Sequence, residues 1–174
     1  MRLADMRGVL ARYQNRLPGI AAGHSYGALI AQMLGGAGGQ PASSSISAIV
    51  AWSPPGPFPP MITAETWRTV ARPMLVVTGT ADSLPIMAPT WEVHRLSYDV
   101  APGPSALFVG EGVDHYFGNI ICRPERTEAP QTTQFDDAVA VSLAFTALAL
   151  RHKQSFARLA RTRIPGKSWV EIKG

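Results

Sequence analysis

The pentapeptide Gly-His-Ser-Tyr-Gly at positions 23–27 limits the possible fold more than any other part of this sequence. A short apolar stretch, 20–22, precedes it, and an apolar, helix-like stretch, 28–34, follows it. A strand that turns sharply into a helix can hold a side chain above a sheet if the neighbouring residues lack side chains that would collide with the turn. The pattern therefore predicts a strand, a tight turn and a helix, with Ser25 exposed at the tip. The alternative is a glycine-rich turn that merely connects two elements.

Two later segments place further polar residues after predicted strands. The apolar, β-branched stretch 74–78 is typical of a parallel strand buried on both faces, and it leads through Gly-Thr-Ala to Asp82. A second short apolar stretch, 105–109, leads into a glycine-containing loop that carries His115. Open α/β sheets place ligands and catalytic groups beyond the carboxyl ends of their strands. The chain order serine, acid, histidine is that of one class of hydrolases.

The alternation of strand-like and helix-like segments predicts an α/β fold, a three-layer α/β/α arrangement with a mainly parallel sheet. Strands are expected at 20–22, 46–51, 74–78 and 105–109, the last of these being the final strand. Helices are expected at 3–13, 28–34, 64–70, 88–96 and 136–152.

These three motifs make the chain resemble the α/β-hydrolase superfamily, in particular serine esterases such as predicted dienelactone hydrolases and platelet-activating-factor acetylhydrolases. Dienelactone hydrolases proper use a cysteine nucleophile, so the serine indicates the esterase side of that group. The resemblance implies a serine carboxylic-ester hydrolase acting through an acyl-enzyme on small or medium acyl esters. Ser25 would be the nucleophile, His115 the base and Asp82 its partner, with the backbone N–H of Tyr26 donating to the oxyanion. No metal or organic cofactor is expected.

The other histidines are weaker candidates for the base. His24 is the variable residue of the pentapeptide, while His94 and His152 fall in predicted helices and are expected at the surface. His115 itself has an alternative, as a loop histidine that only hydrogen-bonds its neighbours.

Asp82 also has a structural alternative, since aspartate is favoured in turns and at helix N-caps. Asp99, Glu111 and Asp114 are less well placed as partners of the base. Asp114 adjoins His115 in sequence and is expected to orient the loop.

A proline-rich segment, 52–61, follows the predicted strand 46–51 and should emerge on the same side of the sheet as Ser25. Proline reduces chain entropy, so this segment could hold Trp52, Phe58 and Met61 as a stiff apolar wall that binds the acyl group of the substrate. The alternative is a rigid connector whose aromatic side chains pack on the core.

The superfamily sheet normally has strands before the serine turn, whereas here only one predicted helix precedes it. The strand 20–22 would then lie at an exposed edge of the sheet, where a second copy or a partner chain could pair with it. The second oxyanion donor of the superfamily comes from the absent half, and losing one such donor costs about a hundred- to a thousand-fold in rate. A non-catalytic module that associates through this edge is therefore an alternative function, and an acyltransferase is another.

Charge and composition bound the remaining possibilities. One catalytic domain is expected at 1–150 and a basic tail at 151–174; the tail carries seven Lys or Arg and one acid, whereas the whole chain has a net charge of +4. Such a tail is more often a solvated helix face than a nucleic-acid or membrane site, and no nucleic-acid partner is expected. The single cysteine, Cys122, excludes an internal disulfide. No membrane span and no signal peptide are predicted, which leaves the compartment undetermined, with the cytoplasm slightly favoured.

Overall fold

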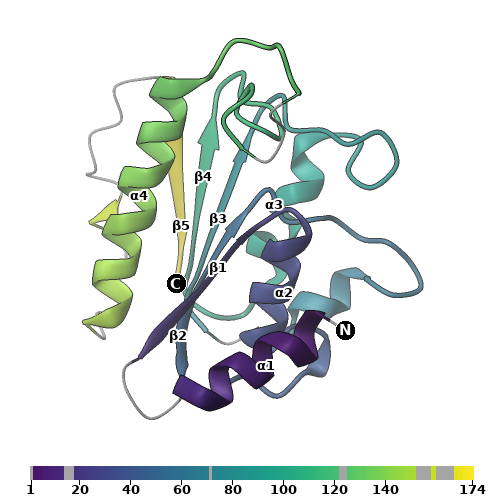
Figure 1. The fold of residues 1–174 in the computed structure, drawn as a ribbon, viewed down its shortest axis with the longest axis vertical. Helices are drawn as coiled ribbons and strands as arrows, with labels where there is room; N and C mark the ends of the chain where they lie inside the picture. Colours follow the sequence, from purple (N-terminus) through teal and green to yellow (C-terminus); the bar gives the residue numbers. More distant parts are fainter. Residues whose placement is uncertain (1, 14–17, 71, 122–124, 152–157, 160–166) are drawn as a thin grey trace.

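The computed structural model describes residues 2–13, 18–70, 72–121, 125–151, 158–159 and 167–174. They form a three-layer α/β/α domain (Figure 1). In chain order its elements are α1 (Arg2–Tyr13), β1 (Gly19–His24), α2 (Tyr26–Leu34), η1 (Ala37–Gly39), β2 (Ile46–Trp52), η2 (Ala64–Trp67), β3 (Met74–Gly79), α3 (Trp91–Val100), β4 (Ser105–Gly110), α4 (Thr132–Leu150) and β5 (Trp169–Lys173). The expected fold class is confirmed.

The sheet has five strands in the order β1-β2-β3-β4-β5. The first four are parallel, and β5 pairs with β4 in the antiparallel direction. Every residue of β3 and β4 is buried, as their unbroken apolar sequences predict. β5 was not predicted: it lies in the basic tail, so part of this tail completes the sheet instead of forming a solvated helix.

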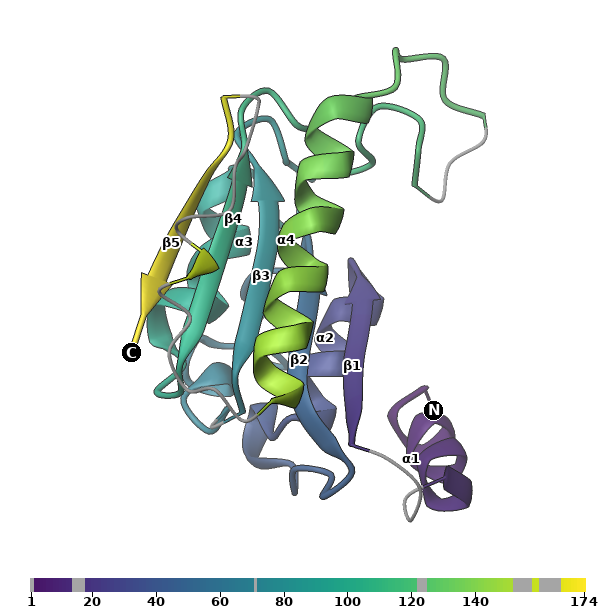
Figure 2. The same cartoon turned by 90° about the vertical axis from the view of Figure 1, so that its left-hand side faces the viewer.

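Helices cover both faces of the sheet (Figure 2), and a hydrophobic layer lies against each face. One joins α2, η2 and α3 to the sheet and contains Trp67 and Tyr98. The other joins α4 to the opposite face and contains Phe117 and Phe145. Because the four parallel strands point the same way, their carboxyl ends lie along one rim of the domain, and the segments that follow β1, β3 and β4 meet there.

The helices differ from the sequence-based expectations mainly at their ends. The segment expected to be helical at 64–70 forms only the short 3₁₀-helix η2, and α3 lies a few residues later than expected. α4 begins at Thr132, so Asp136 and Asp137 lie in its second turn and not at its amino end. His152 and Cys122 lie outside the described residues, so their expected roles stay predictions.

α4 is long and apolar enough, by length and composition alone, to cross a membrane. In the structure one side of it packs on the sheet through Ala138, Val141, Phe145 and Ala149. Leu143, on its outer side, is exposed.

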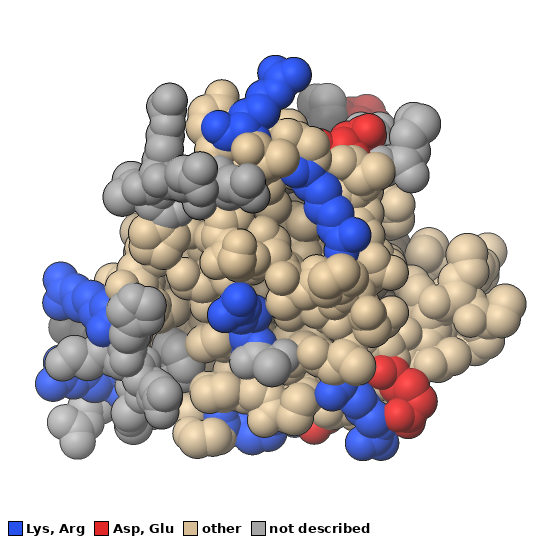
Figure 3. Space-filling view, turned by 90° about the horizontal axis from the view of Figure 1, so that it is seen from below, with Lys and Arg blue, Asp and Glu red and all other residues tan. Residues whose placement is uncertain are grey.

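Within the part of the chain that the structure describes, β1 is an edge strand, as the sequence predicted, because it pairs there only with β2. A cavity of about 560 Å³ lies beside this edge, lined by apolar residues of α1, β1 and α2 that include Leu10, Ile20 and Ile30. In a view from below, basic side chains are scattered over the surface and do not gather in one patch (Figure 3).

Candidate active site

The turn after β1 holds Ser25 in a backbone conformation that residues other than glycine rarely adopt. Ser25 has φ 54° and ψ −123°, and its backbone N–H donates to the carbonyl oxygen of Trp52 at 2.9 Å. Such strained residues persist where the surrounding structure fixes them, and they cluster at functional sites. The serine hydroxyl is thereby presented at the carboxyl end of β1, as the pentapeptide predicted.

The two glycines of the pentapeptide contribute unequally to this turn. A Cβ atom at Gly23 would lie 2.3 Å from the Gly27 carbonyl oxygen, whereas a Cβ at Gly27 would have no atom within 4 Å. The expectation that both positions exclude side chains is therefore wrong for Gly27 and right for Gly23. The strand and the first turn of α2 approach each other at Gly23. Of the two glycines, Gly23 is therefore the one at which the turn leaves no room for a side chain.

The three predicted residues Ser25, Asp82 and His115 lie in contact at the rim of the sheet. Nε2 of His115 lies 3.0 Å from Oγ of Ser25, and Nδ1 of His115 lies 2.8 Å from Oδ1 of Asp82. The imidazole thus joins a hydroxyl to a carboxylate, although the three side chains come from segments after β1, β3 and β4. Asp82 and His115 are buried, at 0% and 3% exposure.

Further contacts hold the Asp82 carboxylate in place. The Thr78 hydroxyl donates to Oδ2 at 2.9 Å, and Nε2 of His94 lies 3.0 Å from Oδ1, at ion-pair distance but without hydrogen-bond alignment. Burial opposes ionisation of Asp82, but the hydrogen bond to His115 and the electrostatic interaction with His94 and His115 outweigh it and hold the pKa of this carboxyl well below its usual range. Asp82 is therefore present as a carboxylate.

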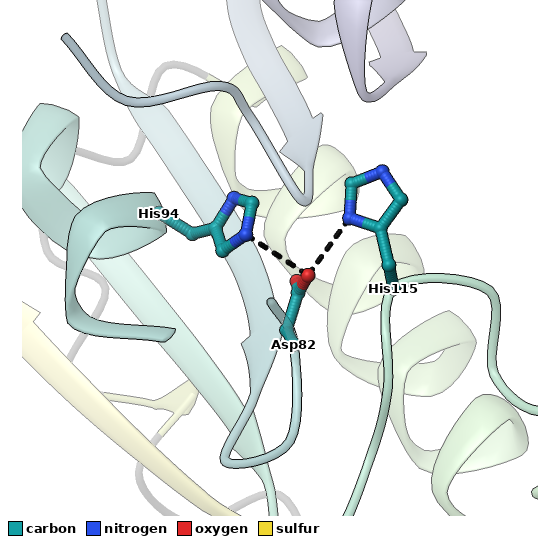
Figure 4. A group of neighbouring side chains, drawn as sticks. All are labelled: Asp82, His94 and His115. Carbon is teal, nitrogen blue, oxygen red and sulfur yellow. Dashed lines mark hydrogen bonds and ion pairs between the residues drawn. The ribbon is translucent and has the colours of Figure 1, made fainter. Parts of the chain in front are cut away.

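The expectation that His94 lies at the surface is wrong. It is 1% exposed, and its ring reaches Asp82 from α3, on the side opposite His115 (Figure 4). The helical pattern of 91–100 gave no sign of this, because histidine is compatible with either face of an amphipathic helix.

His24 contacts the loop that carries His115, a role that the sequence did not predict. Its Nε2–H donates to the backbone carbonyl of His115 at 2.7 Å, and the two ring centroids are 4.8 Å apart. Burial lowers the pKa of His24, which keeps this ring neutral. His24 therefore fixes the backbone from which the His115 ring extends.

Asp114 orients the same loop, as expected. Its Oδ1 accepts hydrogen bonds from the backbone N–H groups of Tyr116 and Gly118, each at 2.9 Å, and its Oδ2 lies 3.0 Å from Arg126. Asp99 and Glu111 lie elsewhere, paired with Arg95 and Lys167.

An apolar cavity of about 340 Å³ opens beside Ser25. Phe58 and Met61 of the proline-rich segment line it, together with Leu29, Met33, Ile62 and Met87. Trp52 does not line it: its ring packs on Phe117 and Phe135 under α4, and its Nε1–H donates to Ser142. Trp52, at the end of β2, points to the α4 side of the sheet. The cavity residues Leu29 and Ile62 belong to the hydrophobic layer on the other side.

The amino end of α2 also faces this part of the rim. Tyr26 is the first residue of the helix, so its backbone N–H has no acceptor within the helix. Its side chain is largely exposed, and its residue lines the cavity next to Ser25. A negatively charged oxygen near Ser25 would be stabilised by this free N–H and by the helix dipole.

Asp82, His94 and His115 offer one nitrogen or oxygen atom each within 4.8 Å of one another, a spacing that a metal ion could also bridge. Both nitrogens, however, lie 2.8–3.0 Å from the same carboxylate oxygen. Two ligands of a tetrahedral zinc ion, each about 2.0–2.1 Å from the metal, stand farther apart than this. The present geometry is that of a hydrogen-bonded and ion-paired cluster.

Comparisons with known proteins identify the fold. No family model and no curated protein matches the sequence. Among solved structures, the chain is similar to puromycin hydrolase, in the crystal structure of a serine-to-alanine mutant complexed with PGG. The match has a TM-score of 0.56 at 16% identity and covers 84% of this chain and 24% of that protein. The chain therefore has an α/β-hydrolase-like fold, and it spans about a quarter of the length of that protein.

Proposed function

We propose that this chain is a serine carboxylic-ester hydrolase that acts through an acyl-enzyme on Ser25. The observation that carries the proposal is the 3.0 Å distance between the Ser25 hydroxyl and Nε2 of His115. A serine hydroxyl needs a base within hydrogen-bond reach in order to attack a carbonyl at neutral pH. The serine nucleophile also favours the esterases among the proteins that the motifs resemble, predicted dienelactone hydrolases and platelet-activating-factor acetylhydrolases.

In this mechanism the Ser25 oxygen attacks the ester carbonyl while its proton passes to Nε2 of His115. His115 then gives that proton to the leaving alcohol, and the acyl group stays on Ser25. Water attacks the acyl-enzyme in the second half of the reaction, with His115 again as the base. Asp82 holds Nδ1–H of His115 throughout, and the Tyr26 N–H stabilises the oxyanion.

The cavity beside Ser25 favours esters of apolar acids as the substrate class. Among the described residues, those that line it include no Asp, Glu, Lys, Arg or His side chain, and its volume of about 340 Å³ is at the low end for small-molecule sites. Small or medium aliphatic acyl esters match this lining better than charged acids. Transfer of the acyl group to an alcohol or amine instead of water would use the same residues, and product analysis with added alcohol separates the two.

Labelling by a fluorophosphonate probe tests the proposal. The folded protein should bind the probe covalently, Ser25→Ala should bind none, and Ser142→Ala, which removes a serine on α4, should label normally. Absence of labelling in the folded wild type, or equal labelling of Ser25→Ala, contradicts catalysis through Ser25. Hydrolysis of short acyl esters then measures turnover.

A second candidate function is a non-catalytic module that associates through the β1 edge. The unpaired edge and the 560 Å³ apolar cavity beside it favour this candidate. Light scattering should then give a dimer, and Ile20→Pro, which removes a backbone donor from the edge, should give a monomer. An active wild-type monomer contradicts it.

A further inference from the structure

Large apolar side chains are exposed around the mouth of the cavity of about 340 Å³ at the candidate active site. Tyr26, Phe58, Met61 and Met87 line this cavity and are also exposed to solvent, Met61 to 73%. Ile86, the neighbour of Met87 in the chain, is 87% exposed, more than any other large apolar residue that the structure describes. Single apolar residues are ordinary at a protein surface, whereas a group of them marks a contact site. We call these five residues the mouth patch.

Two short loops hold the most exposed members of this patch. Backbone hydrogen bonds between Phe58 and Ile62, at 2.8 and 3.0 Å, close the first loop, which contains Met61. A matching pair of bonds, at 2.7 and 2.9 Å, closes the loop 84–88, which contains Ile86. Both loops extend from the domain on the same side, beside α2 and α3 (Figure 1). Because these hydrogen bonds fix the two backbones, the fold itself holds the apolar side chains in solvent.

The chain around these side chains carries no charge. Segments 53–63 and 83–90 contain no Asp, Glu, Lys, Arg or His. Anionic membranes bind proteins through clusters of Lys and Arg, so an anionic surface would not attract these segments. Moving apolar side chains out of water into an uncharged apolar phase is favourable in itself. The mouth patch therefore matches an uncharged lipid surface.

The position of the patch around the cavity favours a surface that contains the substrate. A protein that stayed bound over the mouth would keep substrates away from Ser25. A layer of acyl esters is itself a source of substrate, and an acyl chain could pass from it into the apolar cavity without crossing water. Four of the five patch residues also line the cavity, so the apolar path from the outer surface to the serine is continuous.

We propose that the mouth patch docks the protein on an uncharged lipid surface that contains acyl esters, with Met61 and Ile86 inserted among the acyl chains. Docking itself requires no catalysis. Delivery of an ester from this surface to Ser25 rests on the hydrolase function proposed above. It narrows the substrate class to esters of low solubility, which gather in droplets or bilayers.

Binding to vesicles tests the docking without any turnover. Ser25→Ala, which lacks the proposed nucleophile, should sediment with phosphatidylcholine vesicles, whose headgroups carry no net charge. Adding Met61→Gln and Ile86→Gln together should weaken this binding about tenfold or more, because each removes an apolar side chain from the contact. Leu143→Gln is the matched control: Leu143 is 66% exposed but lies on α4, and its loss should leave vesicle binding unchanged.

Three results overturn the docking: no binding to phosphatidylcholine, binding only when an anionic lipid is added, or an equal loss of binding in Leu143→Gln. Light scattering adds a fourth, a dimer that the substitutions at Met61 and Ile86 convert to a monomer and that binds no vesicles, because the patch would then contact a second copy. If the substituted protein does not fold, the salt dependence of vesicle binding still decides. An apolar contact persists in high salt, whereas a charged one is screened.

Hydrolysis of tributyrin, a short-chain triacylglycerol, links the docking to the active site. In the wild type the rate should rise where tributyrin passes its solubility limit and forms droplets. Ile86→Gln should lower the rate on droplets about tenfold relative to the rate on dissolved tributyrin, since Ile86 belongs to the patch but not to the cavity lining. A ratio equal to that of the wild type contradicts the proposal. Vesicle binding without hydrolysis counts against the proposed function alone, and hydrolysis of dissolved ester without vesicle binding counts against the docking alone.

Discussion

A Cβ atom at Gly23 would lie 2.3 Å from the carbonyl oxygen of Gly27, a backbone atom that cannot move away without breaking the turn. At Gly27 the same addition meets nothing within 4 Å. The turn that presents Ser25 therefore depends on one glycine, and the two positions provide a matched pair of substitutions.

We expect Gly23→Ala to lower the free energy of unfolding by about 1–3 kcal/mol or more and to abolish probe labelling of Ser25, because the turn must open to admit the methyl group. Gly27→Ala should be neutral or stabilising by up to about 1 kcal/mol, because alanine favours the helix in which it lies. Chemical denaturation and probe labelling measure the two effects. Equal destabilisation by both substitutions contradicts the described turn.

Stability at low pH should depend strongly on Asp82. Its pKa in the folded protein lies below its ordinary value of 3.8, so its contribution is complete above that pH and is lost as the pH falls through the folded pKa. The free energy of unfolding should therefore fall steeply below about pH 4. Asp82→Asn should be less stable at neutral pH and should show a flatter acid dependence, as measured by denaturation between pH 2 and 7.

Asp99→Asn is the control for this experiment, because Asp99 forms a partly exposed ion pair with Arg95 on α3. Such pairs contribute about 0–1 kcal/mol, so its acid dependence should resemble that of the wild type. An acid limb that is unchanged in Asp82→Asn contradicts the prediction.

The site residues that directly follow a strand could be predicted from the sequence. Ser25, Asp82 and His115 each come after an apolar strand, and parallel strands end at one rim, so their meeting could be predicted. His94 could not, because histidine and serine are compatible with either face of a helix, so the buried stripe that His94 shares with Ser97 and Tyr98 does not stand out in the sequence. Trp52 was predicted to be part of the wall that binds the acyl group, but its ring lies on the α4 side of the sheet, because neighbouring strand residues alternate and the exact end of β2 decides its direction.

β5 was missed for a different reason. Its sequence, Trp-Val-Glu-Ile-Lys, is short and interrupted by charges, and it lies among basic residues. The structure shows what compensates: Glu171 pairs with Arg95 of α3, and Nζ of Lys173 donates to the carbonyl oxygens of Tyr98 and Ala101. Charges that look solvated in the sequence thus hold an edge strand against a helix, which only the tertiary arrangement reveals.

The cavity beside Ser25 should set the preferred length of the acyl group. We expect Met33→Trp to lower kcat/KM for hexanoyl and octanoyl esters about tenfold and to leave acetyl esters unaffected, since each methylene excluded from the cavity loses about 0.8 kcal/mol. Trp52→Phe is the control: it loses the hydrogen bond to Ser142 and about 1 kcal/mol of stability, without a change in length preference. A length preference that shifts in Trp52→Phe but not in Met33→Trp would contradict the described cavity.

His24 should affect activity through the backbone of His115, and two substitutions separate this effect from simple packing. In the wild type, Nε2–H of His24 donates to the His115 carbonyl at 2.7 Å. His24→Gln keeps an N–H donor near this position, whereas His24→Leu leaves the carbonyl without its donor. Losing a hydrogen bond of this kind costs about 0.5–1.5 kcal/mol of free energy. We therefore expect His24→Leu to lower kcat for short acyl esters about tenfold and His24→Gln to lower it less. KM should change little in either variant. Steady-state kinetics on both variants measure the split. If both variants lose the same activity, or if KM alone changes, His24 contacts the substrate or fills space and does not hold the loop, because only the hydrogen bond distinguishes the glutamine from the leucine.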